Sequence, residues 1–251
     1  MPEKPLPESV LAEIPDWEGA SYRELAGGLT NRTWLVEGRD RRAVLKIDAE
    51  PRSAPYNSRA HEAQIQATAA SKGLANPVLH ATDTVYMTEY LEGAVWTDAA
   101  LDDDTNLTRL ARALRSLHSL PLTGRTFDAV SAARDYASRV ANADADMARD
   151  CIRIIESLPL PRNLCCCHND LVVGNVIATP EIRFLDWEYA CDNDPFFDIA
   201  TVVAHHRMTK ERAHFLLDAY FDGDGARWRD YLAMQVKFYN ALLWLWLNSR
   251  S

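Results

Sequence analysis

The pattern of apolar and polar residues divides the chain into a strand-rich beginning and a helical remainder. Between residues 21 and 47, short apolar runs such as Trp34 to Val36 and Val44 to Leu45 alternate with glycine-containing segments. Short runs of this kind, bounded by turn residues, are typical of strands. We therefore expect three strands in a meander here, and one more strand at residues 85–87.

Helical patterns follow. Residues 58–72 predict a helix that ends at Gly73, because glycine commonly terminates helices. From residue 128 to 158, apolar residues recur every three or four positions, which predicts one long amphipathic helix. A non-helical segment, residues 164–188, interrupts this half. We expect two lobes joined near residue 90, an N-terminal lobe of residues 1–90 and a C-terminal lobe of residues 91–251.

Composition narrows the possible partners. The formal net charge is -9, which argues against a protein whose main task is to hold a nucleic-acid backbone. The longest apolar stretch, residues 241–247, is too short to cross a bilayer. The first residues lack the basic and apolar pattern of a secretory signal. We therefore expect a cytoplasmic protein that needs neither a nucleic acid nor a membrane, and its oligomeric state stays open.

Three of the five cysteines are consecutive, at Cys165, Cys166 and Cys167. Neighbouring residues on a strand point to opposite faces, so these three and His168 are not expected to converge on one tetrahedral zinc ion. An odd number of cysteines also fits a disulfide framework poorly. We interpret them as buried, reduced thiols, since free cysteine behaves as a small hydrophobic residue.

The non-helical segment carries the candidate chemistry. Asp170, Asn175 and Asp186 bring oxygen atoms next to short apolar runs, and Gly174 permits an abrupt turn before Asn175. Oxygen ligands suit magnesium, which proteins typically hold with one or two side chains plus substrate phosphates. Phosphoryl transfer also needs a carboxylate to orient the attacking hydroxyl, and Asp170 is the candidate. The alternative is a structural turn whose carboxylates cap helices.

These motifs resemble a known superfamily. The sequences His168-Asn169-Asp170-Leu171 and Asp186-Trp187-Glu188-Tyr189-Ala190 are similar to those of aminoglycoside phosphotransferases and choline kinases, and above all to bacterial choline and thiamine kinases. The resemblance runs from Gly27 to about Ala204. It implies an α+β, two-lobed, protein-kinase-like fold with a small antiparallel-sheet N-lobe and a larger, mostly helical C-lobe. It also implies ATP and Mg²⁺ as cofactors.

The resemblance also assigns roles. It makes Asp170 the catalytic base and His168 a structural member of the catalytic loop. Asn175 and Asp186 become the magnesium ligands. Asp198, in a segment similar to one that braces this loop in the superfamily, is expected to be structural.

Lys46 is the candidate cation for the nucleotide phosphates. It lies within an apolar strand pattern, where a lysine needs a partner, and Glu62 on the following helix is the natural one. The resemblance assigns this pair to the clamping of phosphates. The alternative is a solvated lysine on an edge strand.

Two further segments complete the expected nucleotide site. Residues Gly27, Gly28, Thr30 and Asn31 belong to a turn that would offer backbone N–H groups and small polar side chains to phosphates. A plain β-hairpin is the alternative. From the resemblance alone, the connector from Glu89 to Leu91 would present backbone groups to adenine.

The acceptor is expected to be a small alcohol. The few residues between Asp186 and Pro195 leave no room for a long regulatory loop, so a protein substrate is not expected. Aromatic faces attract quaternary ammonium groups, which makes Tyr239, Trp244 and Trp246 candidates for the acceptor site. A helix that is apolar nearly all round is, however, usually part of the core.

The sequence departs from choline kinases at His205, where bacterial choline kinases typically carry an acidic residue. This residue and the adjacent His206 suit a quaternary cation only if both are neutral. As the expected acceptor, thiamine or another amino or sugar alcohol is therefore favoured over choline. Glu188, Asp192 and Asp194 could supply negative charge near the acceptor, with a solvated acidic loop as the alternative.

Three functions remain open. The first is an ATP-dependent kinase of choline, ethanolamine or thiamine, and the second is an aminoglycoside or sugar phosphotransferase. The third is a catalytically idle binding protein of the same fold. The third is disfavoured because the sequence contains all of the expected catalytic, metal-binding and phosphate-binding residues, namely Lys46, Glu62, Asp170, Asn175 and Asp186.

Overall fold

The computed structural model describes residues 6–25, 32–52, 58–159, 161 and 163–250, and the chain separates into two compact units. The first unit consists of residues 1–94 and 177–190, and the second of residues 95–176 and 191–251. Residues 177–190 thus group with the N-terminal part of the chain. The division of tasks between residues 1–90 and 91–251 stays a prediction.

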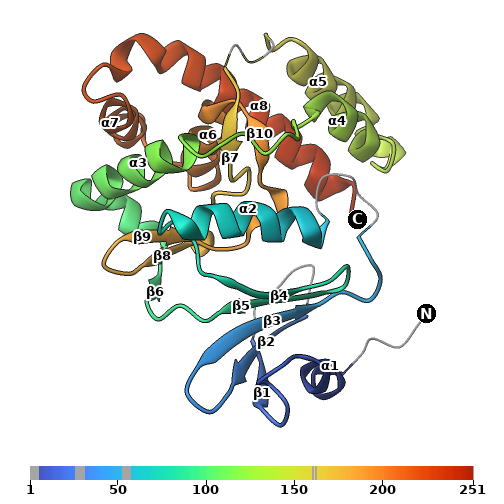
Figure 1. The fold of residues 1–251 in the computed structure, drawn as a ribbon. Coiled ribbons are helices and arrows are strands. Elements are labelled where there is room, and N and C mark those ends of the chain that lie inside the picture. The colour runs from blue at the N-terminus through green and yellow to red at the C-terminus, as the bar shows by residue number, and fades with distance from the viewer. Residues whose placement is uncertain (1–5, 26–31, 53–57, 160, 162, 251) are drawn as a thin grey trace. The chain divides into compact units, whose positions relative to one another are not determined.

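The first unit is built on a five-stranded antiparallel sheet of order β1-β2-β3-β5-β4 (Figure 1). Its strands are β1 (Ser21–Leu25), β2 (Arg32–Glu37), β3 (Arg42–Ile47), β4 (Val78–Ala81) and β5 (Val85–Glu89). The expected meander of three strands and the strand at residues 85–87 are confirmed. A smaller sheet of order β6-β8-β9 follows, with strands β6 (Ala94–Val95), β8 (Val176–Ala178) and β9 (Ile182–Phe184).

Strand β3 shows how the sequence builds this sheet. Ala43, Leu45 and Ile47 are buried in a core that also receives helix α1 (Pro7–Glu13). Because side chains alternate across a strand, Lys46 projects from the other face. Helix α2 (Arg59–Ser71) begins at the cap Ser58. It ends before Gly73, whose φ of +73° is a conformation that glycine adopts without strain.

The second unit is mostly helical. Its helices are α3 (Asp104–His118), α4 (Ala129–Ala137), α5 (Ala145–Glu156), α6 (Pro195–His205), α7 (Lys210–Tyr220) and α8 (Arg229–Asn248). Two short strands, β7 (Cys165–Cys167) and β10 (Cys191–Asn193), pair antiparallel within it. The α+β class is therefore confirmed. Five short 3-10 helices complete the described elements, namely η1 (Asp98–Asp102), η2 (Asn142–Asp144), η3 (Val173–Asn175), η4 (Trp187–Tyr189) and η5 (Gly225–Trp228).

The single long helix expected over residues 128–158 is wrong. The segment forms α4 and α5, which pack on each other and on α8 (Figure 1). A continuous helix of this length would extend for about 45 Å and leave much of its apolar stripe in solvent, whereas two antiparallel helices bury it. The buried side of α5 consists of Ala148, Cys151 and Ile155, while the expected stripe members Met147 and Ile154 are exposed.

Candidate active site

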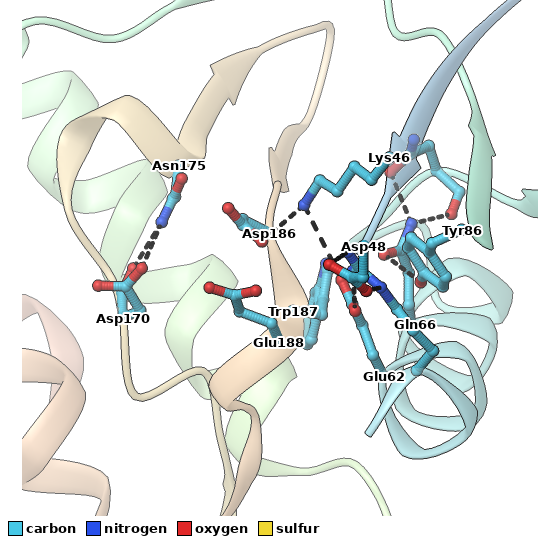
Figure 2. A network of polar contacts seen from close by, with 12 residues as sticks. Lys46, Asp48, Glu62, Gln66, Tyr86, Asp170, Asn175, Asp186, Trp187 and Glu188 are labelled. Atoms are coloured by element: carbon cyan, nitrogen blue, oxygen red, sulfur yellow. Dashed lines mark hydrogen bonds and ion pairs between the residues drawn. The ribbon is translucent and has the colours of Figure 1, made fainter. Parts of the chain in front are cut away.

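Lys46 lies at the centre of a buried ion-pair network in the first unit. Its Nζ is 2.7 Å from Asp186 Oδ1 and 3.9 Å from Glu62 Oε1 (Figure 2). Strand β3 is the middle strand of its sheet, and the Lys46 side chain is only 15% exposed. The alternative of a solvated lysine on an edge strand is therefore wrong.

The charge of Lys46 is maintained by these neighbours. Burial lowers the pKa of the Lys46 ammonium, but the carboxylates of Asp186 and Glu62 outweigh burial, so the pKa is raised above its ordinary value. Lys46 consequently stays a cation in a buried position.

Arg59 is a member of this network that sequence reasoning missed. Its side chain is fully buried, with Nε 2.7 Å from Asp48 Oδ2 and Nη2 3.1 Å from Asp48 Oδ1. Its Nη1 donates to Glu62 Oε2 at 2.6 Å. Arg59 therefore fixes the Glu62 carboxylate, whose other oxygen, Oε1, faces Lys46. The spacing of three residues between Arg59 and Glu62 on a helix was a signal that could have identified the pair.

A second arginine neutralises Glu188. Arg52 Nη1 is 2.6 Å from Glu188 Oε2, and both side chains are nearly buried. Burial and the nearby Asp186 raise the pKa of Glu188, while Arg52 opposes them. The expected contribution of Glu188 to an acceptor site stays a prediction, since the structure shows its carboxylate in use here. The network holds three cations and four carboxylates, namely Lys46, Arg52, Arg59, Asp48, Glu62, Asp186 and Glu188.

Asp186 has an uncommon backbone conformation. Its φ of 61° and ψ of 70° lie in the left-handed region, and it is the residue that precedes helix η4. Non-glycine residues in this region are uncommon and cluster at functional sites. The turn directs the Asp186 carboxylate to Lys46 (Figure 2).

Two predicted parts of the nucleotide site remain, the glycine turn and the connector after β5. Gly27, Gly28, Thr30 and Asn31 lie outside the described residues. At the end of β5, the N–H of Glu89 donates to Pro77, and its carbonyl accepts from the Asn76 side chain. The backbone of Glu89 is thus engaged within the first unit, and the assignment of Glu89 and Leu91 to adenine stays a prediction.

In the second unit, Asp170 and Asn175 form a pair. Asn175 Nδ2 donates to the Asp170 backbone carbonyl at 2.8 Å and to its carboxylate Oδ2 at 3.1 Å (Figure 2). Because the amide nitrogen is used in this way, the Asn175 amide oxygen points away from Asp170. The hydrogen bonds thereby fix the orientation of the Asp170 carboxylate, and they direct the amide oxygen of Asn175 away from it.

Asp198 braces the loop that carries this pair. Its carboxylate accepts from the backbone N–H groups of His168, at 2.8 Å, and Asn169, at 2.7 Å. Burial raises the pKa of Asp198, but hydrogen bonds from His118 and the loop outweigh it and lower the pKa. The expected structural role of Asp198 is confirmed. Asn169 has a φ of 64°, so this brace also holds an uncommon backbone conformation.

His206 is a second brace, which sequence reasoning missed. Its Nε2 accepts the backbone N–H of Val173 at 3.0 Å, and its Nδ1 lies 2.6 Å from Asp98 Oδ1. A nitrogen that accepts a hydrogen bond carries no proton, so His206 is the neutral tautomer that donates from Nδ1 to Asp98. No local pattern in the sequence connects His206 with Val173, 33 positions away.

His205 is neutral for a different reason. Partial burial lowers its pKa, and its Nδ1 lies 3.0 Å from the hydroxyl of Tyr239. Burial, and then the charge of Asp170, raise the pKa of Tyr239. Tyr239 is buried, and its ring packs edge-on against Phe197 with 5.9 Å between the ring centroids.

The C-terminal tryptophans are half-buried on helix α8. At 3.6 residues per turn, Trp244 is rotated by about 140° from Tyr239, whereas Trp246 shares its face. Trp246 also stacks with the guanidinium of Arg250, which lies 4.6 Å from its ring centroid. The structure does not bring the predicted pair Tyr239 and Trp244 onto one face.

The alternative that Asp192 and Asp194 form a solvated acidic loop is wrong. Asp192 is buried and accepts the backbone N–H groups of Thr123 and Gly124. Asp194 is buried as well, caps helix α6 and accepts from the Tyr231 hydroxyl. Buried carboxylates need such partners, and adjacent acidic residues in a sequence do not reveal them.

Comparison with known proteins agrees with these motifs. The profile of the phosphotransferase enzyme family (APH) matches residues 21–235. The chain belongs to this family. The expected recognition, the two-lobed protein-kinase-like fold and the phosphotransferase class are thereby confirmed.

Two named relatives illustrate the range within this phosphotransferase family. Protein LicA of Haemophilus influenzae is 32% identical over 207 residues, which cover 77% of this chain and 61% of the relative. The chain thus spans less than two thirds of that relative. The thiamine kinase of Shigella boydii is 28% identical over 230 residues, covering 86% of this chain and 73% of the relative.

Solved structures show the same fold. The choline/ethanolamine kinase family protein of Mesorhizobium loti has a TM-score of 0.74 at 25% identity, covering 95% of this chain and 83% of the other. The choline kinase LicA of Streptococcus pneumoniae has a TM-score of 0.78 at 19% identity, covering 97% and 89% of the two chains. Within the part of the chain that the structure describes, we find no helix with both the length and the apolar character needed to cross a membrane.

Proposed function

We propose that this phosphotransferase transfers the γ-phosphoryl group of ATP to the hydroxyl of a small amino alcohol, of the choline, ethanolamine or thiamine type. The observation that carries the proposal is the Asp170–Asn175 pair on a loop braced by Asp198. Phosphoryl transfer demands little covalent chemistry of the protein, so a positioned carboxylate and an ordered charge environment supply most of the catalysis.

Asp170 is proposed as the residue that orients the acceptor hydroxyl and takes its proton. Its Oδ2 accepts from Asn175, which fixes the rotation of the carboxylate. His168 contributes through its backbone N–H, which holds the loop on Asp198. His168 is therefore proposed as a positioning residue, whereas Asp170 contacts the reacting group.

Lys46 is proposed to hold the phosphates of the nucleotide. The Lys46–Glu62 ion pair, 3.9 Å in length, leaves Glu62 Oε1 without a hydrogen-bond partner among the described residues. A lysine bound in this way keeps donor capacity for an additional anion. The glycine turn that includes Gly27 and Asn31 is proposed, from the family resemblance, to contact the same phosphates.

From the family resemblance, Asp186 and Asn175 are proposed as Mg²⁺ ligands, since Mg²⁺ prefers oxygen ligands and binds together with substrate phosphates. Asp186 offers a carboxylate, and Asn175 offers the amide oxygen that points away from Asp170. Mg²⁺ held by these residues would neutralise charge on the phosphates during transfer. Within the first unit, the Lys46 ammonium compensates the Asp186 carboxylate.

The choice of an amino alcohol follows from the neutral histidines. His206 donates and accepts in one tautomer, and the lowered pKa of His205 keeps its ring uncharged at neutral pH. The objection that a histidine pair would repel a cationic acceptor is thereby removed. Tyr239, whose hydroxyl lies 3.0 Å from His205, offers an aromatic ring of the kind that binds ammonium groups.

A panel of acceptors tests the proposal. Choline, ethanolamine, thiamine, hexoses and kanamycin are each supplied with Mg-ATP, and ADP release is followed by a coupled assay. We expect acceptor-dependent ADP with at least one amino alcohol, and no more than background with hexoses. Turnover with kanamycin or a hexose alone would assign the chain to the antibiotic or sugar branch, and ADP from none of them would refute the kinase proposal.

A further inference from the structure

The consecutive cysteines place two thiols on one face of a strand. In β7, Cys165 and Cys167 lie on the same side, and Cys166 lies on the other. The Sγ atoms of Cys165 and Cys167 are 3.5 Å apart, and both residues are free cysteines. This separation is much longer than a disulfide bond and close to the distance between two ligands of one metal ion.

A histidine from another element completes the group. His118 lies in the last turn of α3, which packs against β7. One ring nitrogen of His118 and the two sulfur atoms all lie within 4.8 Å of one another. Two thiolates bound to tetrahedral zinc at about 2.3 Å are about 3.8 Å apart, so only a small adjustment is needed. The expectation that His168 could not join the cysteines on one ion concerned a different set of ligands.

We propose that Cys165, Cys167 and His118 form a binding site for a thiophilic metal ion, with Zn²⁺ as the ion of choice. Two sulfur ligands and one imidazole are a donor set that selects zinc over magnesium. The site is separate from the magnesium ligands proposed above, because it contains no carboxylate ligand and shares no residue with them.

The surroundings of His118 favour metal binding at Nδ1. Its Nε2 lies 3.1 Å from Asp198 Oδ2, while its Nδ1 lies 2.7 Å from the Tyr220 hydroxyl. Asp198 also accepts two backbone N–H groups, so it acts as an acceptor and Nε2 carries the proton. A carboxylate that orients a histidine through its second nitrogen is a recurring feature of zinc sites. The Nδ1 lone pair then accepts the hydrogen bond of the Tyr220 hydroxyl, so metal binding at Nδ1 replaces this hydrogen bond and the fourth ligand comes from solvent.

Metal binding at this site displaces protons. Cys165 is partly buried, whereas the side chains of His118, which is 5% exposed, and of Cys167 lie inside. Each Cys–SH that binds Zn²⁺ as a thiolate loses its proton to solvent, so two S–H bonds break as two Zn–S bonds form. Strand β7 leads directly into the 168–175 loop. The bound ion therefore stabilises the base of this loop and takes no part in phosphoryl transfer.

The test uses the untagged full-length protein, reduced and freed of metal by a chelator. Titration with Co²⁺, a spectroscopic substitute for Zn²⁺, is expected to give one equivalent of binding with a sulfur-to-cobalt absorption band that Zn²⁺ abolishes. We expect Cys165→Ala and Cys167→Ala each to weaken binding at least about tenfold. Cys166→Ala is the matched control, because its side chain lies on the opposite face, and it is expected to retain the band.

A second measurement needs no variant. With wild-type protein, Zn²⁺ is expected to protect the partly exposed Cys165 from alkylation, read by peptide mass spectrometry, while the alkylation of Cys151 is unchanged. Absence of the cobalt band, equal loss of it in Cys166→Ala, or alkylation of Cys165 at an unchanged rate would each overturn the proposal. Circular dichroism of every variant separates loss of binding from loss of folding.

Discussion

Asp170 and Asp186 should respond differently to the same substitution. In Asp170→Asn the residue loses its capacity to accept a proton but keeps its size, so we expect kcat to fall about 10²- to 10⁴-fold while the affinity for nucleotide is unchanged. In Asp186→Asn a charged metal ligand is lost, so kcat and the affinity for Mg-nucleotide should fall together. ADP release and a nucleotide-binding titration measure the two effects.

The exposed Asp146 supplies the control for these variants. Its side chain is 94% exposed, and Asp146→Asn should leave both measurements unchanged. Normal turnover in Asp170→Asn would remove the base assignment. Loss of nucleotide affinity in Asp170→Asn equal to that in Asp186→Asn would show that the two aspartates are not separated in role as we propose.

Arg59 is expected to matter for stability more than any exposed arginine. Arg59→Met removes the cation that contacts both Asp48 and Glu62, leaving the buried Asp48 with Arg52 and the buried Glu62 with the more distant Lys46 as their remaining cationic partners. Breaking a buried ion pair from one side typically costs about 3–5 kcal/mol. Urea unfolding measures this loss, and Arg153→Met, a residue that is 75% exposed, should change the free energy of unfolding by about 1 kcal/mol or less. Equal effects would show that the buried network contributes no more than a surface pair.

At the level of elements, the C-terminal end of α6 holds the 168–175 loop through His206. His206→Ala deprives the Val173 N–H of its acceptor. We expect the ordered conformation of the loop to be destabilised by about 1–3 kcal/mol, and kcat to fall as a result. His206→Gln should recover part of the rate, because its amide oxygen can accept the same hydrogen bond. If alanine and glutamine reduce kcat equally, the hydrogen bond is not the reason. His214→Ala serves as a control on helix α7.

His205, at the end of the same helix, gives a pH dependence. Its pKa in the folded protein is lowered below the ordinary 6.5, so the folded state binds the proton less readily than the unfolded state does. Its contribution to stability is therefore complete above pH 6.5 and is lost as the pH falls through the folded pKa. The difference in urea midpoint between wild type and His205→Asn, measured from pH 8 to pH 5, should shift against the wild type as the pH falls. A difference that does not vary with pH would contradict the lowered pKa.

Elements were predictable from the sequence where a local pattern determined them. The strands around Lys46 and the helix between Ser58 and Gly73 follow from alternation and capping, which act over a few residues. The break between α4 and α5 does not, because no glycine or proline occurs there and the helices separate only to bury their apolar sides on each other and on α8. Periodicity identifies a helical segment but cannot determine where tertiary packing folds it back.

The same distinction applies to the site. Asp170, Asn175, Asp186, Lys46 and Glu62 were predicted because their spacing follows a family motif. The partners that hold them, Arg59, Arg52 and His206, were missed because their contacts depend on the folded arrangement of separate elements. Sequence reasoning therefore supplied the candidate residues for the chemistry and left out the residues that contact and hold them.

For the molecule as a whole, charge balance links ligand binding with stability. The buried network of the first unit contains four carboxylates against three cations, so Lys46→Met leaves four against two. We expect this variant to unfold at a lower temperature than the wild type. We also expect Mg²⁺ alone to raise its Tm by more than it raises the wild-type Tm, since a cation near Asp186 then replaces the missing charge.

The control must separate this effect from general binding of divalent cations to a protein with a net charge of -9. Lys237→Met removes the same charge from an exposed position on α8, so it changes the net charge equally without touching the network. Any unspecific stabilisation by Mg²⁺ should be the same for Lys237→Met and Lys46→Met. A larger Tm increase in Lys46→Met alone therefore reports a site at Asp186, and equal increases in the two variants would show that Mg²⁺ does not bind there without nucleotide.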